Sequence, residues 1–360
     1  MIRIATIVGA RPQFIKCAPV SRQLRKLANE VLIHTGQHYD DNMNEVFFRD
    51  LDLPRPDWNL GVGSGFHGAQ TGKMLERIEE VLIKEKPDYV LTYGDTNSTL
   101  AGALATAKLG IRVAHIEAGL RSYNRQMPEE INRVLVDHLS SLLFCPTQTA
   151  VGNLMHEGIT QGVHLVGDVM YDAVLEFTEI ANKRSTILTD LNLNPKEYLL
   201  ATVHRASNTD CEENLRNIVM ALRATDEPVI FPVHPRTRNY LREFGLDGTP
   251  SANGRLQLVE PLGYLDMLIL EQNARLILTD SGGVQKEAYF FRVPCITLRP
   301  ETEWLETVET GWNVVVGANR AQIMSLLNGK QRPRGTPPAL FGNGRAAERI
   351  VSELTEALAL

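Results

Sequence analysis

Residues Leu276–Ala288 read LILTDSGGVQKEA, and this stretch contains the unit from which the rest of the chain is built. An apolar run typical of a buried strand is followed by Thr-Asp-Ser, by two glycines and by a helical pattern that begins near Val284. Glycine has no Cβ, so a ligand can approach the backbone closely, and the free N–H groups at a helix start attract phosphate. The predicted phosphate and ribose contacts are Ser281, Gly282, Gly283 and Glu287. The plain alternative is a strand–helix turn with an Asp or Ser N-cap.

Short apolar runs alternate with amphipathic stretches of helical length along the whole chain. Runs that are continuously apolar are typical of strands buried on both faces, as in parallel sheets covered by helices. In the first half the expected strands are Ile2–Val8, Val31–Thr35, Tyr89–Tyr93, Val113–Ile116, Leu143–Cys145 and His164–Val166. In the second half they are Tyr198–Val203, Val229–Val233, Leu256–Val259, Leu276–Thr279, Cys295–Leu298 and Val314–Val316. The expected helices include Ile15–Leu27, Gly72–Lys86, Ala101–Leu109 and Glu130–Ser141. This alternation predicts the α/β class with doubly wound, Rossmann-like parallel sheets.

So many strands exceed what one open sheet usually holds, and we expect two domains with equal shares. The N-terminal domain is predicted to span residues 1–167 and the C-terminal domain residues 168–344. Gln331–Pro338 (QRPRGTPP) is the most loop-like stretch, and we expect the segment after it, residues 345–360, to form a helix that packs back on the first domain. Two facing domains of this class would bring the carboxyl ends of both sheets to a central cleft, where such sheets bind ligands.

The composition excludes several classes of protein. The chain has 360 residues, 43% of them apolar and 22% charged, with a formal net charge of −6. This mild acidity argues against sequence-independent nucleic-acid binding, which needs a basic face. No apolar run is long enough for a membrane helix, and the N-terminus reads as a strand and turn rather than as a signal peptide. The four cysteines, Cys17, Cys145, Cys211 and Cys295, are far apart and predict neither disulfides nor a zinc site. We expect a cytoplasmic enzyme.

Two cations follow the first strand in Ile7–Lys16 (IVGARPQFIK). Gly9 ends the strand, and Arg11 and Lys16 come soon after it. A guanidinium group offers a planar fork that suits a diphosphate, and an ammonium group offers a point charge. We expect both side chains to contact phosphate. The plain alternative is a pair of solvated surface charges.

Three acidic side chains are candidates for proton transfer. Asp95 and Glu117 each follow a predicted strand, so both are expected at the ligand-facing edge of the sheet, and Glu129 follows a proline at the start of a helix. Several acids in one cleft allow one carboxyl group to stay protonated while another is ionised. The alternatives are an N-cap role for Asp95 and, for Glu129, an i,i+4 ion-pair ladder through Arg133 to Asp137.

Histidines follow two strands of the second half. His204 and His234 are each expected to contact phosphate or a sugar hydroxyl, and His204 also suits an acid role. His34 and His38 share i,i+4 spacing but fall on a strand end and a loop, so we assign no metal to them. The G-x-G-x-x-G match at Gly63–Gly68 follows a polar, proline-rich stretch instead of a buried strand. It predicts a mobile loop at the cleft and no NAD site.

The chain resembles the non-hydrolysing UDP-N-acetylglucosamine 2-epimerase family through GARPQFIK, HTGQHYD, YGDTNST, HIEAGLRS, MPEEINR, the HRA run, HPRTR and TDSGGVQKEA, in this order. Members of this family are similar in fold to two-domain GT-B glycosyltransferases, act as homodimers and need neither NAD nor a metal, so no cofactor is expected. The resemblance implies a UDP-sugar substrate bound through UDP to the C-terminal domain. It also implies inversion at carbon 2 by elimination of UDP and its re-addition. The matched catalytic positions are Asp95, Glu117, Glu129 and His204, and the matched nucleotide or phosphate contacts are Arg11, Lys16, His234, Ser281, Gly282, Gly283 and Glu287.

One departure bears on the sugar. Lys286 stands where the N-acetylglucosamine enzymes often carry an acid. GDVMYD, VQKEA and TEW look more like the branch that acts on UDP-2,3-diacetamido-2,3-dideoxyglucuronate and supplies surface polysaccharides. A sugar with its own carboxylate would gain from positive potential near the diphosphate. The plain alternative for Lys286 is a solvated helix face, and the parent UDP-N-acetylglucosamine stays a candidate substrate.

Two other classes of protein share the nucleotide-sugar contacts. A GT-B glycosyltransferase needs an acceptor groove, and a catalytically silent sensor needs no acids, whereas an epimerase needs acids on both faces of carbon 2. The set of Asp95, Glu117 and Glu129 favours the epimerase. We further expect ligand binding to close the domains, with Ser281–Gly283 on the diphosphate and Arg11 reaching from the other side.

Overall fold

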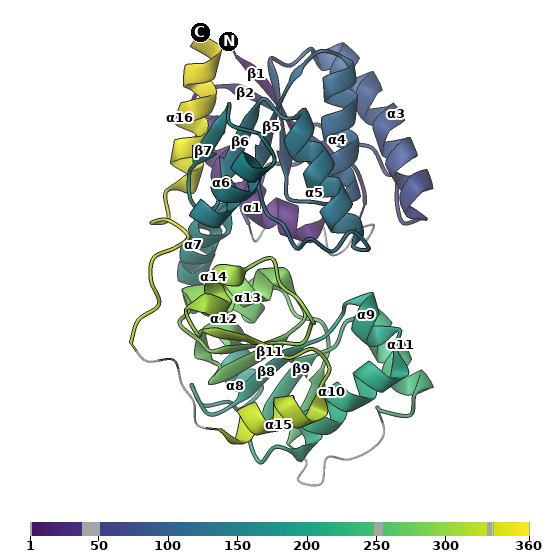
Figure 1. Cartoon of the computed structure of the whole chain (residues 1–360), viewed down its shortest axis with the longest axis vertical. Helices are drawn as coiled ribbons and strands as arrows, with labels where there is room; N and C mark the ends of the chain where they lie inside the picture. The colour runs from purple at the N-terminus through teal and green to yellow at the C-terminus, as the bar shows by residue number, and fades with distance from the viewer. Residues whose placement is uncertain (1, 38–50, 248–254, 330–332, 334, 360) are drawn as a thin grey trace. The chain divides into compact units, whose positions relative to one another are not determined.

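The structure is a computed structural model that describes residues 2–37, 51–247, 255–329, 333 and 335–359 (Figure 1). The chain divides into two compact units. Unit 1 consists of Met1–Leu175 and Ala339–Leu360, and unit 2 consists of Glu176–Pro338. The division falls within helix α7 (Val169–Arg184), later than the predicted break near Gly167–Asp168.

Unit 1 is built on a seven-stranded parallel sheet with the order β3-β2-β1-β4-β5-β6-β7. Its strands are β1 (Arg3–Val8), β2 (Asn29–His34), β3 (Trp58–Asn59), β4 (Tyr89–Tyr93), β5 (Arg112–Ile116), β6 (Leu142–Cys145) and β7 (Val163–Leu165). Its helices are α1 (Arg11–Leu24), α3 (His67–Glu85), α4 (Asn97–Lys108), α5 (Pro128–Leu139), α6 (Gln148–His156), the start of α7 and α16 (Ala346–Ala359). The six predicted strands of this half are present. Strand β3 was missed because two partly exposed residues at a sheet edge carry no apolar run.

Unit 2 is built on a six-stranded parallel sheet with the order β10-β9-β8-β11-β12-β13. Its strands are β8 (Leu199–Thr202), β9 (Val229–Pro232), β10 (Leu256–Val259), β11 (Leu276–Thr279), β12 (Cys295–Thr297) and β13 (Asn313–Val315). Its helices are the rest of α7, α8 (Ile187–Asp190), α9 (Ala206–Thr209), α10 (Glu212–Ala224), α11 (Pro235–Glu243), α12 (Tyr264–Asn273), α13 (Gly282–Phe290), α14 (Leu305–Glu309) and α15 (Arg320–Asn328). All six predicted strands are present, so the predicted α/β class with two doubly wound parallel sheets is confirmed.

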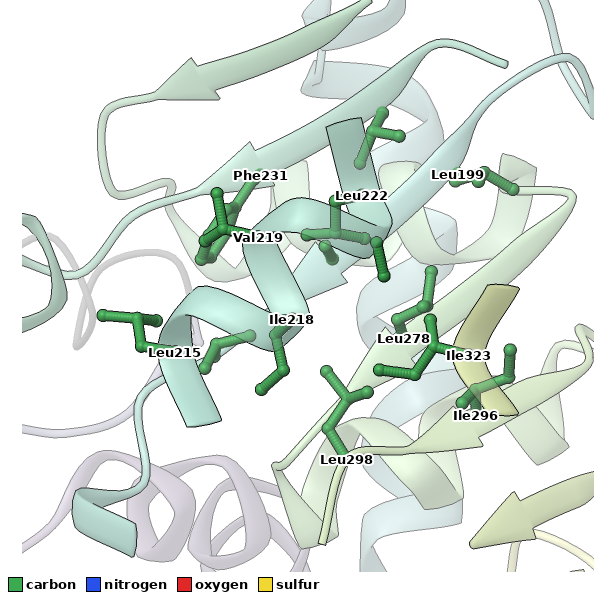
Figure 2. Packing of buried hydrophobic residues seen from close by; sticks show 14 of the residues in the cluster. Leu199, Leu215, Ile218, Val219, Leu222, Phe231, Leu278, Ile296, Leu298 and Ile323 are labelled. Atoms are coloured by element: carbon green, nitrogen blue, oxygen red, sulfur yellow. The ribbon is translucent and has the colours of Figure 1, made fainter. Parts of the chain in front are cut away.

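The packing in unit 2 explains why its strands read as continuously apolar. Helix α10 carries apolar side chains at i, i+3, i+4 and i+7, which lie against strand residues and against Ile323 of α15 (Figure 2). The buried residues of this cluster include Leu199, Leu215, Ile218, Val219, Leu222, Phe231, Leu278, Ile296 and Leu298. Strands covered in this way carry few polar side chains except where they end. The carboxyl ends of the strands are therefore the places to look for chemistry.

Strand order reverses between β1 and β4 in unit 1 and between β8 and β11 in unit 2. At such a switch point the two neighbouring connections leave to opposite faces of the sheet, which opens a crevice at the carboxyl ends of the strands. Gly9 and Asp95 follow β1 and β4, and His204 and Ser281 follow β8 and β11. The candidate residues therefore lie at the switch point of each sheet.

Three helices begin about one turn earlier than the sequence predicted. Helix α1 starts at Arg11 because Pro12, which lacks an N–H, suits the first turn of a helix. Helix α3 starts at His67, and α4 starts at Asn97 after the N-cap Thr96, whose hydroxyl accepts a hydrogen bond from the Thr99 N–H. Polar first turns such as these have no apolar periodicity, so the sequence pattern does not include them in the helices.

The C-terminal helix α16 belongs to unit 1. The carboxylate of Asp172 in α7 accepts hydrogen bonds from the N–H groups of Ala346 at 3.1 Å and Ala347 at 2.8 Å, so it caps this helix from a distant part of the chain. The loop-like stretch Gln331–Pro338 lies partly outside the described residues. No helix in the described part of the chain is long and apolar enough to cross a membrane. The four cysteines are free thiols, and only Cys211 is exposed.

Candidate active site

The turn after β1 is shaped by close packing around Gly9. A Cβ at this position would lie 2.0 Å from Thr35 Oγ1, so any side chain would displace its neighbours. Gln13 in α1 accepts a hydrogen bond from the Gly9 N–H at 2.8 Å and donates one to the Tyr93 carbonyl at 2.8 Å. The ends of β1 and β4 are therefore tied together. Arg11, the first residue of α1, is half-buried beside this turn.

Lys16 and Glu117 form a buried ion pair within unit 1. The Lys16 ammonium donates to Glu117 Oε2, and the two side chains are only 11% and 9% exposed. A Cβ at Gly94 would lie 3.2 Å from Glu117 Oε2 and 3.5 Å from Lys16 Nζ, so the backbone after β4 lies directly against the pair. Glu117 itself has a φ of 73°, which residues other than glycine rarely adopt. For Lys16 the alternative of a solvated surface charge is wrong.

Asp95 is held by an arginine of helix α5. Arg133 donates one hydrogen bond to Asp95 Oδ2 and another to Glu130 Oε2 at 3.0 Å. The N-cap of α4 is Thr96, so the alternative role for Asp95 as a helix cap is wrong. In the alternative of an ion-pair ladder, the step from Arg133 to Asp137 is also wrong, because Asp137 pairs with His115 and Arg121.

Glu130 anchors the loop before α5, whereas Glu129 is half-buried beside it. The Glu130 carboxylate accepts hydrogen bonds from the N–H groups of Ser122 and Tyr123, both at 2.9 Å, and from the Ser122 hydroxyl. The hydrogen bonds of Glu130 give it a structural role, and Glu129 remains the proposed proton-transfer residue of this acidic pair.

A chain of amide side chains links Asp95 to the Gly63–Gly68 segment. Asn132 donates to the Asp95 carbonyl at 2.9 Å and to Asn97 Oδ1 at 3.3 Å. Asn97 donates to Gln70 Oε1 at 2.9 Å, and Gln70 donates to the Gly63 carbonyl at 2.7 Å. The segment was predicted to be a loop, but its last residues begin α3. The amide chain was missed because its members are far apart in sequence.

A buried charge network lies behind these acids. His115 of β5 has Nδ1 2.7 Å from Asp137 Oδ1 and Nε2 2.7 Å from the Gly94 carbonyl oxygen. Arg121 donates to Asp137 Oδ2 at 2.7 Å and binds both carboxylate oxygens of Glu157 at 2.7 Å. Burial on its own would raise the pKa of Asp137, but the hydrogen bonds and charges of His115 and Arg121 lower it below its usual value. Sequence reasoning missed His115, which lies inside β5, two residues before Glu117.

In unit 2 the predicted phosphate turn has the expected local form. Ser281 is the N-cap of α13, with its hydroxyl accepting from the Val284 N–H at 3.4 Å, and the helix begins at Gly282. A Cβ at Gly282 would lie 2.4 Å from Glu303 Oε1 and 3.4 Å from Trp304 Nε1. A side chain at this helix start would have to displace the Glu303 carboxylate.

Lys286 is buried in helix α13. It is 1% exposed, and its ammonium lies 4.1 Å from the ring centroid of Trp304, a cation–π contact. The interpretation as a solvated helix face is therefore wrong. Since Trp304 also lies against Gly282, the Lys286 cation is stacked behind the start of the helix. Glu303 on the same segment accepts a hydrogen bond from Arg299 at 2.9 Å.

His204 is supported by the buried carboxylate of Asp280. Asp280 accepts hydrogen bonds from the N–H groups of His204 at 3.1 Å and Arg205 at 3.0 Å and from Asn208 Nδ2 at 3.0 Å, and His204 Nδ1 lies 3.2 Å from Asp280 Oδ1. Desolvation lowers the pKa of His204 and the charges of Arg205 and Arg299 lower it further, while Asp280 raises it. With 45% of the His204 side chain exposed, this shielding is partial. The arrangement leaves Nε2 as the ring nitrogen available to a ligand.

The remaining predicted residues are placed as follows. Glu287 is buried, and its Oε1 accepts a hydrogen bond from the Tyr264 hydroxyl at 3.0 Å. His234 is the exposed N-cap of α11 and accepts from the Arg236 N–H at 3.3 Å. His34 packs edge-on against Phe14, and His38 lies outside the described residues. No cluster of three or more possible metal ligands occurs among the residues that the structure describes.

Comparison with known proteins identifies the family of the chain. A profile described as UDP-N-acetylglucosamine 2-epimerase matches residues 22–355. The chain belongs to the UDP-N-acetylglucosamine 2-epimerase family. A UDP-N-acetylglucosamine 2-epimerase homolog from Methanococcus maripaludis is 56% identical over 98% of this chain and 99% of its own length. The UDP-2,3-diacetamido-2,3-dideoxy-D-glucuronate 2-epimerase of Pseudomonas aeruginosa is 47% identical over 99% of this chain and 100% of its own.

Solved structures of the epimerase family share the fold. The crystal structure of the Methanocaldococcus jannaschii UDP-GlcNAc 2-epimerase in complex with UDP-GlcNAc and UDP is 49% identical. It covers 99% of this chain and 100% of its own, with a TM-score of 0.91. The predicted similarity in fold to GT-B proteins is therefore confirmed, because these solved epimerases are of the GT-B type.

Proposed function

We propose that this chain inverts carbon 2 of a UDP-2-acetamido sugar by eliminating UDP and adding it back to the opposite face. The observation that carries the proposal is the placement of Asp95 and Glu117 at the ends of the neighbouring strands β4 and β5, beside the switch point of the unit 1 sheet. Each carboxylate is paired with a cation, Arg133 or Lys16. Membership of the epimerase family supports the same reaction.

The reaction needs such acids because the carbon 2 proton has no neighbouring carbonyl group to acidify it. Elimination removes this proton and breaks the bond from the anomeric carbon to UDP, which leaves a 2-acetamidoglucal. Protonation of carbon 2 from the other face and return of UDP give the epimer. We assign proton transfer to Asp95, Glu117 and Glu129 and stabilisation of the departing UDP to His204.

The nucleotide contacts are proposed for the two glycine-bearing turns. In unit 2 the start of helix α13 offers the N–H groups of Gly282 and Gly283 and the Ser281 hydroxyl to the diphosphate, and Glu287 offers a carboxylate to ribose hydroxyls. His234 at the start of α11 and Arg11 at the start of α1 are further proposed phosphate contacts. We propose that the two units close on the bound ligand, which would keep the intermediate from water.

A reaction without acceptor tests the proposal. The protein is incubated with UDP-N-acetylglucosamine in D₂O, and the products are followed by ¹H NMR. We expect interconversion with the manno epimer and deuterium at carbon 2 of the product. In a second sample labelled with ¹⁸O in the bridging position, we expect the label to scramble into the diphosphate. No epimer without an acceptor from either this sugar or UDP-2,3-diacetamido-2,3-dideoxyglucuronate, or sugar transfer once an acceptor is added, would refute the epimerase in favour of a glycosyltransferase.

A second candidate substrate, UDP-2,3-diacetamido-2,3-dideoxyglucuronate, is favoured by Lys286. Its buried ammonium, stacked on Trp304 behind the start of α13, adds a fixed positive charge near the proposed diphosphate position. A sugar that carries a carboxylate gains from this charge, and a neutral sugar does not. Side-by-side assays decide between the sugars: a higher kcat/KM for UDP-N-acetylglucosamine would exclude the uronate. Lys286→Met should lower kcat/KM for the uronate more than for the neutral sugar.

We also propose that the protein is a homodimer and is located in the cytoplasm. Ile131 and Leu135 lie four residues apart on helix α5 and are 48% and 47% exposed, which is unusual for apolar side chains on one helix face. Free cysteines agree with a reducing compartment. Light scattering after gel filtration should give twice the chain mass of 40.1 kDa, and a monomer at micromolar concentration would contradict the dimer.

A further inference from the structure

The acid-bearing turns of unit 1 share one buried support. Gly94 precedes Asp95, and its carbonyl oxygen lies 2.7 Å from His115 Nε2. Gly119 follows Glu117 by two residues, and its N–H donates to Asp137 Oδ2 at 3.1 Å. His115 and Asp137 are themselves joined at 2.7 Å, and both are fully buried. A single pair of side chains therefore holds the turn that carries Asp95 and the turn that carries Glu117.

The hydrogen-bond partners determine where the protons of His115 are. A carbonyl oxygen can only accept, so Nε2 carries a proton that it donates to Gly94. At the other ring nitrogen, the Asp137 carboxylate already accepts from the Gly119 N–H and from Arg121 through its second oxygen. Its lowered pKa favours the ionised form, which again can only accept. Both nitrogens of His115 are therefore donors, and an aliphatic or hydroxyl side chain could not replace it.

The charges around His115 balance this arrangement. Glu157, the C-cap of α6, accepts two hydrogen bonds from Arg121, so the network contains two carboxylates, a guanidinium group and an imidazole. The ionisable groups on the surrounding elements are Asp137, Arg121, Glu157, Cys145 and, beyond Gly94, the pair of Lys16 and Glu117. Asp137 belongs to α5, Glu157 ends α6, and the neighbouring Lys16 belongs to α1. The network and its neighbours therefore connect several elements of unit 1.

We propose that His115 and Asp137 are positioning residues for the two acids, with His115 acting through the Gly94 carbonyl. This inference rests on the proposed epimerase function. Gly94 lies against the Lys16–Glu117 pair as well as beside Asp95, so a shift of this one peptide would move both carboxylates. A displacement of about 1 Å at a catalytic group can cost about 100-fold in rate.

Two amide substitutions at one position separate this role from simple filling of the core. The terminal amide of asparagine takes roughly the place of Nδ1, and that of glutamine roughly the place of Nε2. His115→Gln therefore keeps a donor for Gly94, and His115→Asn keeps a donor for Asp137. We expect His115→Asn to lower kcat about 100-fold and His115→Gln about 10-fold or less, with KM and the UDP dissociation constant within threefold of the unmodified protein. His156→Gln, at an exposed histidine on α6, is the matched control and should not change kcat.

Amide hydrogen exchange gives a readout that needs no substrate. The Gly94 N–H donates to the Ile116 carbonyl at 3.0 Å, so it reports on the turn itself. We expect faster exchange over residues 94–96 in His115→Asn and nearly unchanged exchange in His115→Gln. Equal losses of kcat in both variants, or no loss in either, would overturn the proposal. If His115→Asn does not fold, a fall above 100-fold in His115→Gln with unchanged exchange would overturn it as well. An unmodified protein without epimerase activity would refute the proposed function, and the exchange comparison would still decide the positioning role.

Discussion

The contact between Asp280 and His204 leads to a prediction in which charge is removed and shape is kept. In Asp280→Asn, the amide oxygen can stay with the N–H donors of Arg205 and Asn208, which lie 3.0 Å from the present Oδ2. The new NH₂ group then faces His204 Nδ1, which lies 3.2 Å from Oδ1. Because an amide NH₂ can only donate, Nδ1 must become an acceptor and the proton of the neutral ring moves to Nε2. The substitution reverses the tautomer of His204.

The magnitude follows from the number of bonds to the carboxylate. Three N–H donors, those of His204, Arg205 and Asn208, all reach Oδ2, which changes from a charged to a neutral acceptor. Each such bond is weakened by about 1 kcal/mol, so the free energy of unfolding of unit 2 should fall by about 3 kcal/mol. Loss of the Asp280 charge also lowers the pKa of His204 further, because Asp280 is the group that raises it. Less protonated His204 is then available to the departing UDP at neutral pH, and kcat should fall at least about 100-fold.

A double-mutant cycle checks the reasoning. Turnover of Asp280→Asn, His204→Asn and the double variant is measured against pH, with thermal unfolding to account for stability. We expect the double variant to be no slower than His204→Asn alone, and the optimum of Asp280→Asn to move to lower pH. Asp210→Asn, at a half-exposed carboxylate that pairs with Arg236, is the matched control. Multiplicative losses from the two substitutions would show that Asp280 does not act through His204.

Three further outcomes are expected. Asp95→Asn and Glu117→Gln should each lower turnover by about two to four powers of ten with little change in UDP affinity, measured by kinetics and calorimetry; near-normal rates would remove the acids from the mechanism. Desolvation by burial raises the pKa of Asp172 to about 6 from 3.8, so this group stabilises the fold below the lower value and loses that contribution as pH rises through the higher one. Asp172→Asn should therefore remove up to about 3 kcal/mol of pH dependence between pH 4 and 7 in denaturant titrations, and an unchanged slope would contradict the shift. Gly9→Ala should destabilise unit 1 by about 1–3 kcal/mol in thermal unfolding, because its Cβ would lie 2.0 Å from Thr35 Oγ1, and an unchanged midpoint would show that the turn can relax.

The amino-acid sequence was sufficient to predict the described strands other than β3 and the turns that end them. An apolar run buried on both faces is a local property, and so is a glycine turn such as that at Ser281–Gly283. Candidate residues could be found by asking which polar groups directly follow such runs, and this rule located Asp95, Glu117 and His204. The sequence pattern did not predict β3 or the polar first turns of α1, α3 and α4, because these segments have no apolar periodicity.

Only the tertiary structure decided which of these groups meet. The strand order, which makes β1–β4 and β8–β11 the switch points, depends on crossovers between distant segments. Spacing along a helix suggested Asp137 as the partner of Arg133, yet Arg133 reaches Asp95 and Asp137 holds His115. The burial of Lys286 against Trp304 could not be predicted from the sequence either. Which charged groups pair depends on the distance between them and on how far water is excluded. Both are determined by elements that the fold brings together from far apart in the chain.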